Sequence, residues 1–303
     1  MPEKYNSTGV HLRLVLTMIF WGGTFVAGRL LAEELHPQSA ASFRFLLASL
    51  MLLTVVFIQN RSFPGLTGKQ WIAMALLGLT GVFSYNILFF TGLQTVEAGR
   101  ASMIIAVNPV VTAILAILLF RERFDIPGSA GMVLSVTGAL IVISRGQPGV
   151  IFAGGIGVGE LCIIGCVLSW SAYTLIGKHL LTNIEPLVVV GYSCALGTLY
   201  LTVLALFTGH LMDVKVLSAK STGCLLYVAF FGTTLGFVWF YDGVKQLGAG
   251  KASMYVNLVP VSGILLGSLL LGERLEGSLV LGGALVFLGL YLINRKARPL
   301  LKT

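Results

Sequence analysis

The sequence predicts an all-α integral membrane protein of ten transmembrane helices, arranged as two inverted-topology five-helix repeats. Composition, the number of apolar stretches and an internal repeat all predict this fold. The chain is 56% hydrophobic and 11% charged, with a mean hydropathy of +0.92. A soluble domain of this length would have to expose much of that apolar surface, so we expect a bilayer around it.

Ten apolar stretches are long enough to cross a bilayer as helices. A membrane helix takes about 17–25 residues, and it satisfies its backbone polar groups within its own segment. The expected spans are 12–32, 39–58, 70–92, 100–120, 127–144, 159–181, 187–208, 222–244, 252–271 and 277–294.

The second half of the chain repeats the first. Residues 20–31 read FWGGTFVAGRLL and residues 169–180 read SWSAYTLIGKHL, which pairs Arg29 with Lys178 at an offset of 149. Such a fixed offset is the mark of an internal repeat.

The repeat continues along both halves. GRASM at 99–103 recurs as GKASM at 250–254, and Pro109 matches Pro260, now at an offset of 151. Because each half holds five spans, an odd number, the second copy must lie upside down relative to the first.

The expected domain boundaries follow from this repeat. Residues 1–145 form the first five-helix repeat, 146–158 a glycine-rich crossover, and 159–303 the second repeat with a basic cytoplasmic tail. Paired apolar bundles are typical of secondary transporters. The sequence has no Walker motif for nucleotides, so movement of a substrate would follow a gradient.

The distribution of cations predicts the orientation. With the N-terminus inside, 13 of the 20 Lys and Arg residues fall on the cytoplasmic side and 6 on the other side. The positive-inside rule then places both termini in the cytoplasm of a multi-pass protein of the cell (inner) membrane. The net charge of +8 is thus a topology signal and no sign of nucleic-acid binding. The first span is too long for a cleaved signal peptide.

The opening of the chain resembles the EamA-type branch of the drug/metabolite transporter superfamily. The matching sequence is WGGTFVAGRLLAEELHPQSAASFRFLLASL, and the matching residues are Trp21–Gly22, Arg29, Pro37, Arg44–Phe45, Pro109 with Glu122, and their repeats Pro260 with Glu273. The resemblance covers essentially the whole chain. Within the superfamily, the chain looks similar to bacterial ten-helix amino-acid and metabolite exporters. It implies that the two repeats are arranged around a central cavity, which is lined by spans 1, 3, 4, 6, 8 and 9 and works by alternating access.

Candidate substrate-binding residues lie on those spans. Aromatic rings can line a site for partly apolar metabolites, and Tyr and Trp add a polar group. The candidates are Trp21, Thr24, Tyr85, Phe89, Asn108, Trp170, Tyr173, Trp239, Tyr255 and Asn257. The Trp21/Trp170 pair and Tyr85 come first among them. The alternative for each ring is packing or lipid contact.

Two prolines are expected to break their helices at matching repeat positions. Pro109 and Pro260 each remove a backbone donor and would free the carbonyls of Ile105 and Val256. A freed carbonyl at membrane depth is tolerated where it faces protein or a watery cavity. The alternative is a simple kink, with the neighbouring Asn repairing the backbone.

Three cations are candidates for gating. Arg44 lies about two turns into the second span, where an ionisable residue is a functional candidate, although it is near enough to the outer surface to snorkel. Arg100 and Lys251 begin spans at opposite mouths and could attract a carboxylate, or anchor lipid headgroups instead. No midplane carboxylate or histidine offers a proton relay.

The leading function is a secondary transporter that exports amino acids or related small metabolites through a midplane aromatic-lined cavity. Nucleosides or drug-like compounds are alternative cargoes, and a passive channel or a membrane-embedded lipid enzyme are alternatives of other classes. No HExxH-like or DxxD-like cluster is present, so we expect no enzyme, and no cofactor or metal. The expected partners are a small-molecule substrate and the lipid bilayer, with the oligomeric state open.

Overall fold

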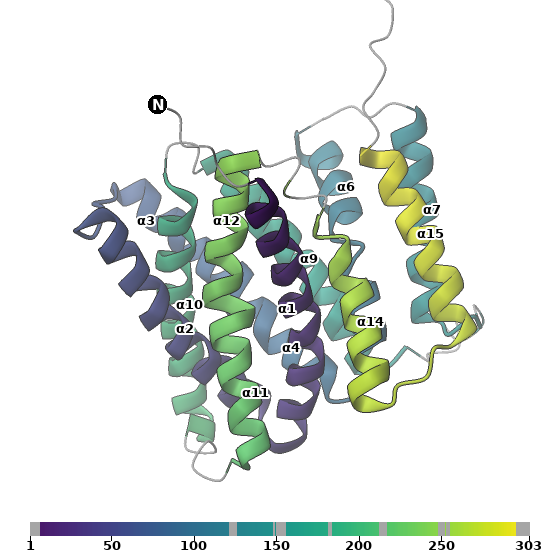
Figure 1. Cartoon of the computed structure of the whole chain (residues 1–303), viewed down its shortest axis with the longest axis horizontal. Helices are drawn as coiled ribbons and strands as arrows, with labels where there is room; N and C mark the ends of the chain where they lie inside the picture. Colours follow the sequence, from purple (N-terminus) through teal and green to yellow (C-terminus); the bar gives the residue numbers. More distant parts are fainter. Residues whose placement is uncertain are drawn as a thin grey trace, which may run out of the picture.

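The computed structural model describes residues 7–120, 126–147, 149, 156–180, 184–211, 217–247, 252 and 255–294. Within these ranges the regular elements are all helical, as predicted (Figure 1). Seven helices are long and apolar enough to cross a membrane, and three further apolar helices are shorter. They correspond in order to the ten expected spans.

The helices of the first half follow one another as five spans. They are α1 (Ser7–Glu34), α2 (Pro37–Asn60), α3, η1 and α4 (Gly68–Leu77, Gly78–Ser84 and Tyr85–Leu93), α5 and α6 (Ala98–Ile105 and Asn108–Phe120), and α7 (Ile126–Ile143). The segment η1 is a π-helix inserted between α3 and α4.

The second half has the same order. Its helices are α9 (Val158–Leu180), α10 (Pro186–Phe207), α11, η3 and α12 (Ala219–Ala229, Phe230–Leu235 and Gly236–Leu247), α14 (Leu258–Leu271) and α15 (Gly277–Asn294). The segment η3 is again a π-helix, at the position that matches η1.

Helix boundaries follow from local residue chemistry. Both α2 and α10 begin with a proline, whose missing N–H would be unsatisfied in a first turn in any case. The helix α14 ends at Gly272, whose φ of 68° is a left-handed conformation that glycine adopts readily.

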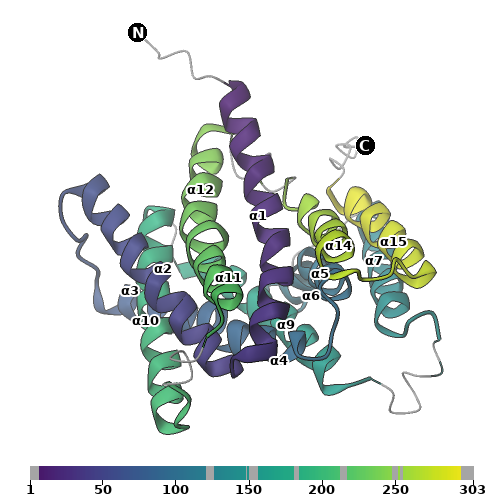
Figure 2. The same ribbon diagram turned by 60° about the horizontal axis from the view of Figure 1, so that its bottom comes forward.

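The most extensive helix contacts join one half to the other. Helix α7 packs against α15, α2 against α10, α1 against α14, and α4 against α9. Figure 2 shows the α7/α15 pair at one side of the bundle and the α2/α10 pair at the opposite side, with α1 between them.

Two hydrogen bonds join residues that are equivalents in the two repeats. The Ser49 and Thr198 hydroxyls lie 2.8 Å apart at a sequence separation of 149, and the Ser135 hydroxyl donates to the Val286 carbonyl at 3.2 Å with a separation of 151. A residue can touch its own equivalent only near the symmetry axis. The pseudo-twofold axis of the inverted repeat therefore passes through the α2/α10 and α7/α15 pairs.

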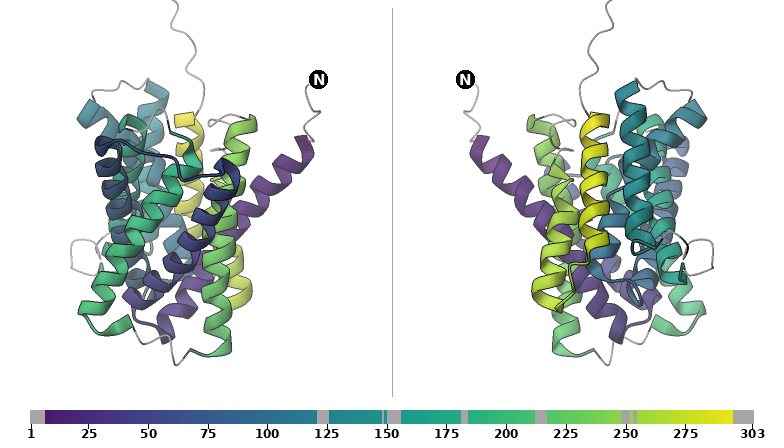
Figure 3. Two further views of the ribbon diagram at one scale, coloured as in Figure 1. Left: turned by 90° about the vertical axis from the view of Figure 1, so that its left-hand side faces the viewer. Right: turned by 90° about the vertical axis from the view of Figure 1, so that its right-hand side faces the viewer.

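Helix α1 is the longest of the described helices. Its 28 residues rise about 42 Å, more than the roughly 30 Å hydrocarbon core. Figure 3 shows α1 inclined to the other helices, with its first turns projecting beyond the bundle. Tilting is the usual way for a long helix to fit a bilayer.

Small residues set the spacing between the halves. A Cβ added at Gly138 would lie 2.5 Å from the Gly282 carbonyl oxygen, so α7 and α15 meet backbone to backbone. On α14, a Cβ at Gly263 would meet the Ser102 hydroxyl at 2.6 Å. The GxxxG pair of α14 thus packs at least in part within the chain.

The contact between α1 and α14 yields a stability prediction. A Cβ at Gly22 would lie 2.4 Å from Ser262 Cβ and 2.7 Å from the Gly263 backbone nitrogen, so Gly22→Ala should force the helices apart. We expect the melting temperature of the detergent-purified protein, followed by tryptophan fluorescence, to fall by roughly 2–5 °C.

The matched control is Gly9→Ala on the same helix, where a Cβ would have nothing within 4 Å. Alanine favours a helix over glycine, so this variant should melt at the wild-type temperature or slightly above it. Equal melting temperatures for the two variants would contradict a tight α1/α14 contact.

Candidate functional site

A cavity of about 40 Å³ lies between the two halves. Its walls come from α2, η1 and α4 of the first half and from α9, α10 and α12 of the second, that is, from spans 2, 3, 6, 7 and 8. The resemblance implied spans 1, 4 and 9 as well, and this cavity does not use them. The lining residues are Arg44, Phe45, Gly81, Val82, Tyr85, Asn86, Trp170, Tyr173, Val190, Ser193, Cys194 and Phe237.

Arg44 points into this cavity. Its relative exposure is 8%, its Nε donates to Thr233 Oγ1 at 3.1 Å, and its Nη1 donates to Asn86 Oδ1 at 3.0 Å. The guanidinium carbon also lies 5.1 Å from the centre of the Phe45 ring. The expectation that Arg44 snorkels to the outer surface is wrong, because these two bonds hold the side chain between the halves.

Asn86 and Thr233 are fixed as acceptors for that guanidinium. Asn86 Nδ2 donates to the Val82 carbonyl at 2.8 Å, which turns the amide oxygen toward Arg44. The Thr233 hydroxyl donates to the Val228 carbonyl, five residues earlier, at 2.8 Å, so its lone pairs are left to accept. Thr233 lies within η3, and Asn86 lies two residues after the end of η1.

The positive charge of Arg44 has no anionic partner among the described residues. The ion pairs of this part of the chain join Arg13 to Asp242, Arg29 to Glu273, and Arg100 to Glu276. The guanidinium stays protonated in proteins, and a buried charge is normally paired. A lone cation at membrane depth is a functional candidate by default.

Three of the predicted aromatic residues line the cavity together with Arg44, and a fourth packs behind them. The Trp170 ring stacks on Tyr173 with centroids 5.1 Å apart, and it meets Tyr85 at 5.5 Å. Tyr85 stacks in turn on Phe89, which is buried behind it. Room for Tyr173 comes from Gly81 of η1, where a Cβ would lie 2.2 Å from Tyr173 Cδ2.

Trp21 and Thr24 lie one layer behind the cavity wall. The Trp21 ring contacts Phe237, which lines the cavity, at 5.8 Å, and it contacts Phe240 at 5.3 Å. Thr24 donates to the Trp21 carbonyl at 2.6 Å and fills the space left by Gly232 of η3. The repeat partners Trp21 and Trp170 therefore occupy different layers.

Trp239 and Tyr255 lie away from the cavity. Trp239 follows Phe237 by two residues, which places it on the opposite face of α12, where it packs on Phe20 at 5.9 Å. The Tyr255 hydroxyl bonds His11 Nδ1 near the start of α1. Neither ring lines the cavity described above.

The helices are interrupted just before both prolines. Helix α5 ends at Ile105 and α6 begins at Asn108, while a turn at 256–257 precedes α14. The prediction that the Val256 carbonyl is free is wrong, because this carbonyl accepts a hydrogen bond from the Val259 N–H at 3.0 Å.

The residues around these breaks differ in their surroundings. Pro109 is exposed and Pro260 is buried. The Oδ1 atom of Asn108 is buried with no hydrogen-bond partner among the described residues. Asn257 lies at the start of α14 and makes no side-chain cap.

Arg100 is buried in an ion pair rather than free at a mouth. Its Nη2 donates to Glu276 Oε2 at 2.6 Å and its Nη1 donates to the Val142 carbonyl at 2.6 Å. Burial raises the pKa of the Glu276 carboxyl, but the hydrogen bond and charge of Arg100 outweigh this effect and hold the pKa below its ordinary value. The pair therefore persists at neutral pH.

Glu273 closes the same end of the bundle. Its two oxygens accept the backbone N–H groups of Ala98 and Gly99 at 2.7 and 2.8 Å, at the positive end of α5. Arg29 Nε lies 3.8 Å from Oε1 of Glu273. We call Arg29, Arg100, Glu273 and Glu276 the ionic cluster. Lys251 and Glu122, the repeat partners of Arg100 and Glu273, lie outside the described residues.

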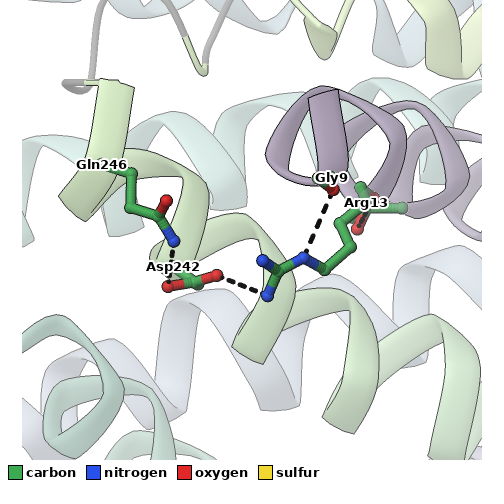
Figure 4. A network of polar contacts seen from close by, with 5 residues as sticks. Gly9, Arg13, Asp242 and Gln246 are labelled. Carbon is green, nitrogen blue, oxygen red and sulfur yellow. Dashed lines mark hydrogen bonds and ion pairs between the residues drawn. The ribbon is translucent and has the colours of Figure 1, made fainter. Parts of the chain in front are cut away.

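A polar network ties the opposite end of α1 (Figure 4). Arg13 Nη1 donates to Asp242 Oδ2 at 2.8 Å, and Gln246 Nε2 donates to Asp242 Oδ1 at 2.9 Å. Arg13 Nε also reaches the Gly9 carbonyl at 3.4 Å. These contacts join the beginning of α1 to the end of α12.

A larger, open hollow of about 450 Å³ lies where α7 ends and α15 begins. Its lining includes Arg145, Gln147 and Glu276 but none of the clustered rings, so its size alone does not make it the substrate site. In the described part of the chain, no three His, Cys, Asp or Glu side chains are grouped as metal ligands are.

Two relatives of this chain are named as a transporter and as an exporter. The uncharacterized transporter YyaM of Bacillus subtilis (strain 168) is 30% identical over 92% of this chain and 92% of its own length. The probable terminal-alkyne amino-acid exporter of Streptantibioticus cattleyicolor is 26% identical over 93% of this chain and 92% of its own. A solved crystal structure, 16% identical, shares the fold with a TM-score of 0.65 over 96% of this chain and 99% of its own.

The EamA-like transporter family matches residues 9–144 and again residues 157–295. The two matches fall on the two five-helix halves and together cover most of the chain. This chain belongs to the EamA-like transporter family of multi-pass membrane proteins.

Proposed function

We propose that this chain is a secondary transporter that exports amino acids or related small metabolites by alternating access. The observation that carries the proposal is the cavity between the two halves, where Arg44 lies beside the rings of Tyr85, Trp170 and Tyr173. A cation with aromatic neighbours suits a small zwitterion that has an apolar side chain.

The size of the cavity supports a site that opens and closes. At about 40 Å³ it holds little more than one water, whereas ligand pockets run to roughly 300–1,000 Å³. A substrate would enter only after the two halves rock apart. The π-helical segments beside the cavity, η1 and η3, supply places at which the helices could bend.

The proposed orientation puts both termini in the cytoplasm of the inner membrane. The ionic cluster, at the end of α1 remote from the N-terminus, would then seal the outer side. The amino-acid cargo is supported by the name of the Streptantibioticus relative and by the chemistry of the cavity.

Counterflow in proteoliposomes tests the cargo and the site together. We expect saturable exchange of labelled L-phenylalanine, reduced roughly tenfold or more in Trp170→Ala, because truncating a ring that contacts the substrate removes more than about 1.4 kcal/mol of binding. The experiment is run with and without a pH gradient.

The matched control is Trp239→Ala, in the same half but away from the cavity. It should keep the flux within about twofold if it folds, which size-exclusion chromatography checks. Equal losses in the two variants would argue against this cavity, and absence of exchange for a panel of amino acids would remove the amino-acid cargo.

The ionic cluster gives a gating prediction. Glu276→Gln leaves the buried Arg100 without its carboxylate, so the sealed end should open more often. In a chain stripped of its native cysteines, we expect a Cys placed at the buried Ser102 to react with maleimide roughly tenfold faster, since a charged hydrogen bond contributes about 1.5–3 kcal/mol.

Glu33→Gln serves as the control, because Glu33 is exposed at the same end of α1. It should leave the labelling rate unchanged. If Glu276→Gln labels at the control rate as well, the ionic cluster does not hold this end closed.

A further inference from the structure

We infer that the Arg44 guanidinium binds the carboxylate of the transported molecule, so that the substrate class is small carboxylates with an apolar side chain. The inference rests on the proposed transport function and deepens it by naming the group that is recognised and the residue that recognises it.

The hydrogen bonds of Arg44 leave one edge of its guanidinium available. Nε is used by Thr233 and one N–H of Nη1 by Asn86, while Nη2 has no hydrogen-bond partner among the described residues. The planar fork of arginine matches the two oxygens of a carboxylate, which it binds with two parallel hydrogen bonds. Nη1 and Nη2 retain the N–H groups for such a pair.

The charge balance of the cavity favours an anion. Asn86 and Thr233 are neutral, and the residues that line the cavity include no Asp or Glu. A cation buried with neutral partners alone keeps most of its desolvation penalty, which a carboxylate would offset. Arg100 is buried to a similar extent but differs from Arg44, because its charge is already paired with the carboxylate of Glu276.

The rest of the cavity wall suits the remainder of such a molecule. Tyr85, Trp170 and Tyr173 present ring faces next to the guanidinium, and Phe237 closes the wall on the side of α12. An apolar side chain can pack on these rings, and an α-ammonium group can lie over a ring face without a protein carboxylate. Amines that lack a carboxylate find no anionic partner here.

A ligand series on the wild-type protein tests the inference without any substitution. The competitors of labelled L-phenylalanine counterflow are 3-phenylpropionate, which keeps the ring and carboxylate, and phenethylamine, which keeps the ring and ammonium. We expect 3-phenylpropionate to compete and phenethylamine to be weaker by roughly tenfold or more, because it cannot form the charged hydrogen bonds.

Arg44→Gln and Arg44→Lys extend the test. The glutamine variant should lose phenylalanine binding by roughly tenfold or more, and the lysine variant should retain part of it, because it keeps a point charge without the fork. Arg13→Gln, in the half-exposed network near the N-terminus, is the matched control and should bind as the wild type does.

The outcomes separate the two proposals. If phenylalanine moves but phenethylamine competes equally, or if folded Arg44→Gln keeps wild-type affinity, Arg44 is not the carboxylate anchor and the transport function stands. If none of the probes binds or moves in the wild-type protein, the amino-acid function and the anchor both fall. The anchor is supported if Arg44→Gln loses both the binding of phenylalanine and the competition by 3-phenylpropionate, while Arg13→Gln keeps both.

Discussion

The packing of each half against the other is the constraint on which the rest of the structure depends. The pairs α2/α10 and α7/α15 lie on the pseudo-twofold axis, and there the Ser49 and Thr198 hydroxyls, equivalents in the two repeats, bond each other. In a bilayer, apolar contact with lipid is as favourable as contact with another helix, so close approach through small residues and a few hydrogen bonds must hold the halves together. A seam of this kind can shift without exposing a core to water.

The polar groups along that seam have different roles at different depths. Near one end the ionic cluster pairs each cation with a carboxylate from the other half, which makes a closed contact. In the middle, Arg44 reaches from the first half to Thr233 of the second with neutral acceptors only. The ionic cluster thus joins the halves through opposite charges, whereas the charge of Arg44 has no carboxylate among the residues that line its cavity.

The sequence could predict the ten spans, the inverted repeat and the proximity of Tyr85, Trp170 and Tyr173. It could not predict which way a ring faces. In a helix that is apolar on most sides, the hydrophobic pattern does not show which side faces the protein and which faces lipid. Trp239 is an example, since aromatic residues stand at 237, 239, 240 and 241, on two opposite sides of the same helix. The partner of Arg100 was equally hidden, because Glu276 lies 176 residues further along the chain.

Asn86 and Thr233 were missed for a different reason. Each is one of several polar residues in a mainly apolar span, and nothing in the sequence marks the π-helical segment beside it. The only available signal was polarity itself, since a buried amide or hydroxyl at membrane depth needs a partner.

The π-helical segments also bear on the history of the chain. η1 spans Gly78–Ser84 and η3 spans Phe230–Leu235, and Gly81 and Gly232 within them are equivalents at the offset of 151. A π turn carries one residue more than an α turn, so each arises when a helix gains a residue in its middle. Two independent insertions would have to fall at the same repeat position by coincidence. A single insertion before the duplication requires no such coincidence. One insertion in an ancestral five-helix unit, before its duplication, is the simpler account of the two segments.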